Sequence, residues 1–60
     1  MKLAKLSNTM WDHKVRPEEL AYKTGLSITT ILKARKGLNV TLGTATLIAQ
    51  GMKCKKEDLV

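Results

Sequence analysis

The sequence predicts an all-α fold, a compact bundle of about five short helices. Apolar residues recur at three- and four-residue spacing along the 60-residue chain, and no segment shows the alternation typical of a β-strand. Residues that favour helix ends, among them Pro17, Ser27 and Gly37, divide the chain into short segments. We therefore expect one domain over residues 1–60. Its core should be thin, because so short a chain buries only about 60% of its unfolded surface.

The first helix is expected at about residues 2–13. Leu3, Leu6 and Met10 are spaced so that they line one side of it. Trp11 lies next to this apolar stripe, and we expect it to be a partly buried flank of the helix. It is not expected to form a cage for a cation or ligand, because the chain has only one other aromatic residue.

A second helix is expected to open at Pro17, because proline fits the first helical turn, where its missing N–H would have no partner. Arg16 is the expected N-cap. This start is weaker than usual because arginine has no side-chain oxygen to accept a backbone N–H. Leu20 and Ala21 should face inward, and Gly25 should close the helix in the left-handed conformation.

A third helix is expected at about residues 28–36, with Ser27 as a good N-cap and Gly37 at its end. Ile31 and Ala34 should point inward. This arrangement leaves isoleucine and threonine side chains on the outer face. A helix that only filled a core would carry ordinary solubilising residues there.

A fourth helix is expected at about residues 42–50, with Thr41 as its N-cap. Its inward residues are expected to be Leu42, Ala45, Ile48 and Ala49. Glycines near its two ends make it a poor helix in isolation. A last short turn at about residues 55–59 should bring Leu59 back onto the core.

Basic residues are segregated from acidic residues along the chain. The net charge is +6, and the five acids are Asp12, Glu18, Glu19, Glu57 and Asp58. No acid lies between residues 20 and 56. The basic residues of that stretch are Lys23, Lys33, Arg35, Lys36, Lys53, Lys55 and Lys56. Such a field attracts polyanions, most often nucleic acid, although a soluble protein that happens to be basic would have the same composition.

The composition argues against several other classes of protein. Cys54 is the only cysteine and His13 the only histidine, so we expect no disulfide, no metal site and no cofactor. Cys54 should be a small buried apolar residue. No enzyme is expected, because His13 and Ser27 lie on different elements and form no nucleophile–base pair. The chain lacks both a signal peptide and the roughly 20 apolar residues of a membrane span, so we expect a cytoplasmic protein.

Several residues carry the spacing of a helix-turn-helix motif. They are Leu20, Ala21, Gly25, Leu26, Ser27, Ile31 and Gly37, followed downstream by Thr41, Leu42, Ile48, Ala49, Met52 and the segment KKEDLV. The whole resembles the Cro/repressor-type helix-turn-helix domain, also called the xenobiotic-response-element family of regulators. The resemblance covers nearly all of the chain. It implies a lambda-repressor-like fold in which the second and third helices form the motif.

The resemblance also implies a function, that of a sequence-specific regulator of bacterial or phage type that binds double-stranded DNA. Its third helix would lie in the major groove. The positions implied to reach base edges are Ile28, Thr29, Thr30 and Lys33. The positions implied to touch the DNA backbone are Arg16, Pro17, Ser27, Lys36 and Asn39. Methyl groups suit thymine methyls, threonine hydroxyls contact any base edge weakly, and lysine donates to guanine or phosphate.

The chain departs from the family in three respects. Many members have glutamine where this chain has Pro17 and Ile28, which removes one means of fixing the helix on DNA and one amide that reads bases. Many pair an arginine of the first helix with a glutamate of the third. The matching residues here are Met10 and Arg35, which leaves Arg35 free for solvent or phosphate. No residue follows Val60, so we expect no small-molecule effector domain.

The expected partner is a double-stranded DNA operator, bound by a homodimer. One small monomer makes few base contacts, and Leu47, Leu59 and Val60 are expected to leave apolar surface near the chain end. An alternative is a protein-binding adaptor, an antitoxin-like or inhibitor module that reuses the fold. A basic membrane-surface protein is a weaker alternative, because such proteins usually have one longer helix with a continuous apolar face.

Overall fold

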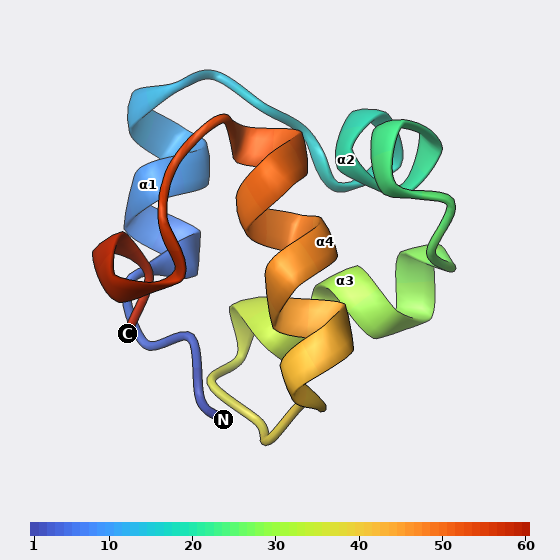
Figure 1. The fold of residues 1–60 in the computed structure, drawn as a ribbon. Coiled ribbons are helices and arrows are strands. Elements are labelled where there is room, and N and C mark those ends of the chain that lie inside the picture. Colours follow the sequence, from blue (N-terminus) through green and yellow to red (C-terminus); the bar gives the residue numbers. More distant parts are fainter.

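Four α-helices and one turn of 3₁₀ helix make up the fold (Figure 1). The computed structural model describes residues 1–60. The elements are α1 (Leu6–Asp12), α2 (Pro17–Thr24), α3 (Ile28–Arg35), α4 (Leu42–Met52) and the 3₁₀ turn η1 (Lys56–Asp58). The all-α class is confirmed, but the fifth expected helix is only a 3₁₀ turn. None of the helices combines the length and apolar composition that crossing a membrane requires.

The helix-turn-helix pair α2–α3 is supported by the other two helices. α2 packs against both α3 and α4, α1 packs against α3, and η1 packs against α4. Figure 1 shows α4 through the middle of the molecule, with α1 on one side and α2 on the other. The chain after α4 returns beside α1, so both ends of the chain lie on the α1 side. This arrangement leaves one side of α3 free.

The core is wholly apolar. Its buried residues are Leu3, Leu6, Met10, Leu20, Ala21, Ile31, Ala34, Ala45, Ile48, Ala49, Met52 and Leu59. These include nearly all of the inward positions expected for the helices. Leu42 is the exception, because it is 59% exposed. It is the first residue of α4, and this turn projects beyond the core.

α1 is shorter than expected, since it begins at Leu6 and not near residue 2. The residues before it make backbone hydrogen bonds to distant parts of the chain. The Val40 N–H donates to the Met1 carbonyl at 2.8 Å, and the Lys5 N–H donates to the Leu59 carbonyl at 2.7 Å. These hydrogen bonds hold residues 1–5 in an irregular conformation, so α1 does not begin before Leu6.

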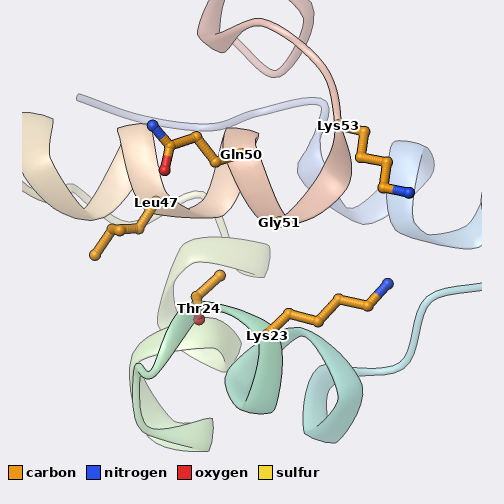
Figure 2. A pocket seen from close by; sticks show the side chains of 6 residues that line it. All are labelled: Lys23, Thr24, Leu47, Gln50, Gly51 and Lys53. Carbon is orange, nitrogen blue, oxygen red and sulfur yellow. The ribbon is translucent and has the colours of Figure 1, made fainter.

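α4 extends to Met52, beyond its expected end near residue 50. Gly51 lies inside this helix where it crosses α2. A β-carbon on Gly51 would lie 2.8 Å from Thr24 Cγ2 and 2.9 Å from Leu20 Cδ1. Figure 2 shows Thr24 directed toward Gly51 across this contact. The missing side chain therefore sets how closely the two helices approach.

Two expectations about apolar surface residues are wrong. Trp11 is 84% exposed and is not a partly buried flank. Successive helical residues are turned by about 100°, so Trp11 is turned away from the buried Met10 that precedes it. Leu59 is buried, which confirms that the last turn returns it to the core, so it adds nothing to an apolar surface.

The other two residues of the expected apolar surface, Leu47 and Val60, are exposed but are not neighbours. Leu47 lines a hollow together with Lys23 and Thr24 of α2. The C-terminus lies beside α1, on the other side of α4 (Figure 1). The chain end therefore presents no continuous apolar patch.

Cys54 is half-buried and packs against the core, so its expected burial is only partial. Burial, and then the negative charge of Asp58, raise the pKa of the Cys54 thiol. The thiol therefore stays neutral near pH 7 and packs as a small apolar group.

Gly51→Ala should destabilise the fold, although alanine favours helix more than glycine. The added methyl would overlap the buried Leu20 and Thr24, whose hydroxyl donates to the Leu20 carbonyl at 2.8 Å. We expect the free energy of unfolding to fall by about 1–2 kcal/mol, as in other overpacked cores. Urea unfolding followed by circular dichroism measures it.

Gly43→Ala is the matched control in the same helix. No atom lies within 4 Å of the β-carbon that it would add. This variant should gain up to about 1 kcal/mol from helix propensity. Equal gains for the two variants would contradict the steric account of Gly51.

Candidate nucleic-acid interface

A tight turn joins α2 to α3. Gly25 has a φ of 74°, in the left-handed region that was expected for it. Its N–H donates to the Ala21 carbonyl at 2.9 Å. The Thr24 hydroxyl accepts the N–H of Leu26 at 3.3 Å. The turn is therefore held by its own hydrogen bonds, and it sets the direction in which α3 leaves α2.

Ser27 caps the start of α3 as expected. Its Oγ accepts the Thr30 N–H at 3.2 Å and shares a hydrogen bond of 2.9 Å with the Thr30 hydroxyl. Both hydroxyls therefore already have partners within the protein. Thr30 is also half-buried. This expected base-reading residue consequently lies at the edge of the exposed face of α3.

The outer face of α3 lies opposite Ile31 and Ala34, the two buried residues of this helix. With about 100° between successive residues, the positions furthest from the core are Thr29, Leu32, Lys33 and Lys36. All four are exposed. Ile28 lies at one edge of this face and is 45% exposed. The structure thus places Thr29 and Lys33 centrally, and Ile28 and Thr30 at the edges.

Leu32 is a member of this face that the sequence analysis did not identify. It is 40% exposed and lies one helical turn after Ile28. With about 100° between successive residues, the two side chains lie on the same side of Thr29 on the helix surface. Helical spacing alone contained this signal, because a residue one turn from an outward-facing residue also faces outward.

The end of α3 is closed by a glycine, as expected. Gly37 has a φ of 81°. The Leu38 N–H donates to the Lys33 carbonyl at 3.2 Å, which forms a Schellman-type end. Lys36 is the C-cap residue and is exposed beside this turn.

Asn39 lies in the loop after α3 and is exposed. Its Oδ1 accepts a hydrogen bond from the Met1 amino group at 3.1 Å, and that amino group also donates to the Val40 carbonyl at 2.9 Å. One end of the Asn39 amide is therefore engaged. Its NH₂ group makes no hydrogen bond within the chain.

The start of α2 contains the remaining candidates. Arg16 is the N-cap residue, in an extended conformation, and its exposed side chain makes no capping hydrogen bond. Pro17, the first residue of the helix, is half-buried. Lys14, in the turn before α2, is an exposed cation with a φ of 56°. A bound anion would also gain from the positive end of the α2 dipole.

The cations of α3 are not engaged in ion pairs. The one ion pair of the structure joins Lys23 Nζ to Glu19 Oε2 at 3.2 Å, within α2. No ion pair within the protein therefore neutralises the positive charges of Lys33, Arg35 and Lys36.

The basic stretch seen in the sequence does not form one continuous patch. Lys53, Lys55 and Lys56 follow α4, in the segment that returns beside α1, whereas α3 crosses the other end of α4 (Figure 1). The basic residues on the outer face of α3 are Lys33 and Lys36.

A separate hollow lies between α2 and α4 (Figure 2). Its volume is about 310 Å³, and it is lined by Lys23, Thr24, Leu47, Gln50, Gly51 and Lys53. None of these residues belongs to α3. No group of three or more His, Cys, Asp or Glu side chains comes together as a metal site would require.

A family model described as a Cro/C1-type HTH DNA-binding domain matches residues 5–60 of the chain. The match includes α1, the α2–turn–α3 motif, α4 and η1. No curated protein sequence and no solved structure matches the chain significantly.

Ser27→Ala should lower the free energy of unfolding by about 1 kcal/mol, because it removes the side chain that caps α3. Thr29→Ala is the control in the same turn. The Thr29 side chain makes no hydrogen bond within the protein and is exposed, so this change should cost less than about 0.5 kcal/mol. Thermal unfolding of both variants compares the two costs. Equal values would mean that the Ser27 cap does not stabilise α3.

Proposed function

Because the chain belongs to the Cro/C1-type helix-turn-helix family of DNA-binding domains, we propose that it is a sequence-specific transcriptional regulator that binds double-stranded DNA with α3 in the major groove. We propose a bacterial or phage-type regulator that acts in the cytoplasm without catalysis or a cofactor. The single observation that carries this proposal is the outer face of α3. Thr29, Leu32, Lys33 and Lys36 are exposed on this face, and both ends of the helix are fixed by caps.

The dimensions of α3 suit the major groove. An α-helix with its side chains is about 10–12 Å wide, and the groove is about 12 Å wide. The buried Ile31 and Ala34 hold one side of the helix on the core, so only the opposite side is available to bases. This burial supports an approach to DNA through the outer face of α3.

Thr29 and Lys33 are proposed as the central base readers, with Ile28 and Thr30 at the edges. The Thr29 hydroxyl has no partner in the protein and remains available for a base edge. Lys33 donates to guanine O6 or N7, and the methyl groups of Ile28 suit thymine methyls. Thr30 contributes its methyl group, because its hydroxyl is bonded to Ser27.

The backbone contacts are proposed at the two ends of the motif. Arg16 and Pro17 stand at the start of α2, where the helix dipole favours phosphate. Lys36 and Asn39 stand at the far end of α3, where a cation and an amide NH₂ group donate to phosphate. Ser27 is proposed to approach phosphate from the first turn of α3.

We propose that two chains bind one operator. A single outer face with four reading positions gives few base contacts, and a two-fold pair doubles them. The exposed Leu47 is an apolar candidate for contact between the chains, whereas the buried Leu59 is not. An adaptor that binds proteins through the same fold is the alternative function. It predicts weak DNA affinity with little response to salt.

Thr29→Ala and Lys36→Ala should distinguish contacts that read bases from contacts that hold the DNA backbone. The enriched site is first selected from random duplex DNA. Thr29→Ala should then cost about 1–2 kcal/mol on this site and little on random duplexes, because base contacts carry the discrimination. Lys36→Ala should weaken binding to both duplexes alike and reduce the salt slope by about 1. Titrations of each variant on both duplexes at two salt concentrations provide the measurement.

Equal losses on both duplexes for Thr29→Ala would remove α3 as the reader. A flat salt response of the unmodified chain would favour the adaptor instead. Neither substitution should unfold the protein, since both side chains are exposed.

Sedimentation of the complex tests the proposed pairing. Two chains should bind one selected duplex, whose half-sites should be about 34 Å apart, one helical turn of DNA. Inserting half a turn of DNA between the half-sites should abolish binding by the second chain. One chain per selected duplex would defeat this prediction.

A further inference from the structure

A hollow with a mixed apolar and basic lining lies where α1 passes into α2. Its volume is about 370 Å³, and it is lined by Met10, Trp11, Lys14, Val15 and Arg16. Apolar side chains form most of its wall, and both charged residues are cations. We refer to it as the Trp11 hollow. Neither the core nor the reading face of α3 accounts for it.

Trp11 has no evident structural role. Its indole makes no hydrogen bond within the chain, and most of its surface is exposed to solvent. Scattered exposed apolar residues are normal on proteins, but Trp11 also borders a hollow beside two cations, Lys14 and Arg16. Tyr22 is equally exposed on α2, but it lines no hollow and lies one helical turn after the acidic Glu18.

A second hollow lies between α1 and the end of α3. It has a volume of about 320 Å³ and is lined by Ser7, Leu32, Arg35 and Lys36. Its charged residues are again cations only. Ser7 and Trp11 are four residues apart on α1, so they lie on the same face of that helix, about 6 Å apart along its axis. The two hollows therefore adjoin one another along α1.

Together these residues form a basic strip that runs from the end of α3, across α1, to the start of α2. We define the α1 strip as Arg35, Lys36, Ser7, Trp11, Lys14 and Arg16. No acidic residue lines either hollow. Its two ends, Lys36 and Arg16, are the residues already proposed to hold the DNA backbone.

We propose that the α1 strip is a track for one sugar–phosphate strand and that Trp11 packs against a deoxyribose within it. This inference rests on the proposed function, because it adds a contact to the same DNA. A DNA strand presents anionic phosphates alternating with apolar sugars. The strip presents cations at both ends and an indole with Val15 between them. The lysine and arginine stems add apolar surface beside the charges.

A protein segment with carboxylates is the competing occupant, and the position of the strip disfavours it. Arg16 and Lys36 bound to phosphate would bring DNA over both ends of the strip, which leaves little room for a protein. The contact is independent of sequence, because it involves no base. It therefore adds affinity without adding discrimination.

The single tryptophan of the chain makes the test direct. The probe is a random-sequence 20-bp duplex added at low salt to the 60-residue chain. The emission of Trp11 should move to shorter wavelength, and its quenching by acrylamide should fall. Trp11→Ala should weaken binding severalfold on random and selected duplexes alike, because the apolar contact with the sugar is lost. Lys14→Ala should lower the salt slope by about 1.

Tyr22→Ala is the matched control and should leave the affinity unchanged. Circular dichroism should show Trp11→Ala folded, since the side chain is exposed. Unchanged Trp11 fluorescence, with unchanged affinity of Trp11→Ala for labelled duplexes, would overturn the inference and leave the proposed function intact. Absence of DNA binding by the unmodified chain would overturn both. Equal protection of Trp11 by polyglutamate and by duplex of equal charge would assign the hollow to carboxylates and also overturn the inference.

Discussion

The contact between α2 and α4 at Gly51 is the constraint on which the rest of the molecule depends. The missing side chain lets α4 lie directly on Leu20 and Thr24, and Thr24 is also the residue whose hydroxyl holds the α2–α3 turn. One residue thus links the core to the geometry of the motif. The core consists of only twelve apolar side chains, without any buried polar group. The free energy of unfolding of so small a domain is low, so a misplaced methyl would remove a large part of it. Movement of α2 would therefore also move α3.

The position of α3 depends on its ends as much as on its buried side. Only Ile31 and Ala34 attach it to the core, and helices of eight residues are marginal in isolation. The remaining order comes from Ser27 at the start and Gly37 at the end. This arrangement leaves most of the helix surface exposed. It also means that Ser27 serves stability first, and that any contact it makes with phosphate uses an oxygen already engaged with Thr30.

Much of the fold could be predicted from the sequence, because helix caps and apolar spacing act locally. Pro17, Ser27, Thr41 and the two left-handed glycines occupy their expected places. The errors arose where distant segments meet. The start of α1 depends on hydrogen bonds to residues near 40 and 59, and periodicity within one segment carries no information about these bonds. Likewise, the exposure of individual site residues, such as the half-buried Thr30, depends on packing between elements.

The departures from the family pattern have a common physical consequence. Proline and isoleucine in place of glutamine remove directional amide contacts, and the methyl groups of Ile28 would discriminate bases more weakly than an amide does. Met10 is buried where many relatives carry an arginine, and Arg35 is thereby left without an intramolecular partner, at the edge of the α1 strip. Compared with the family pattern, this chain lacks an internal ion pair and two amides, and it has unpaired cations along the α1 strip. Recognition by such a surface draws more of its affinity from phosphate and less from bases. On the proposed function, counterion release would supply most of the binding energy, and the proposed second chain on the same operator would be the main source of specificity.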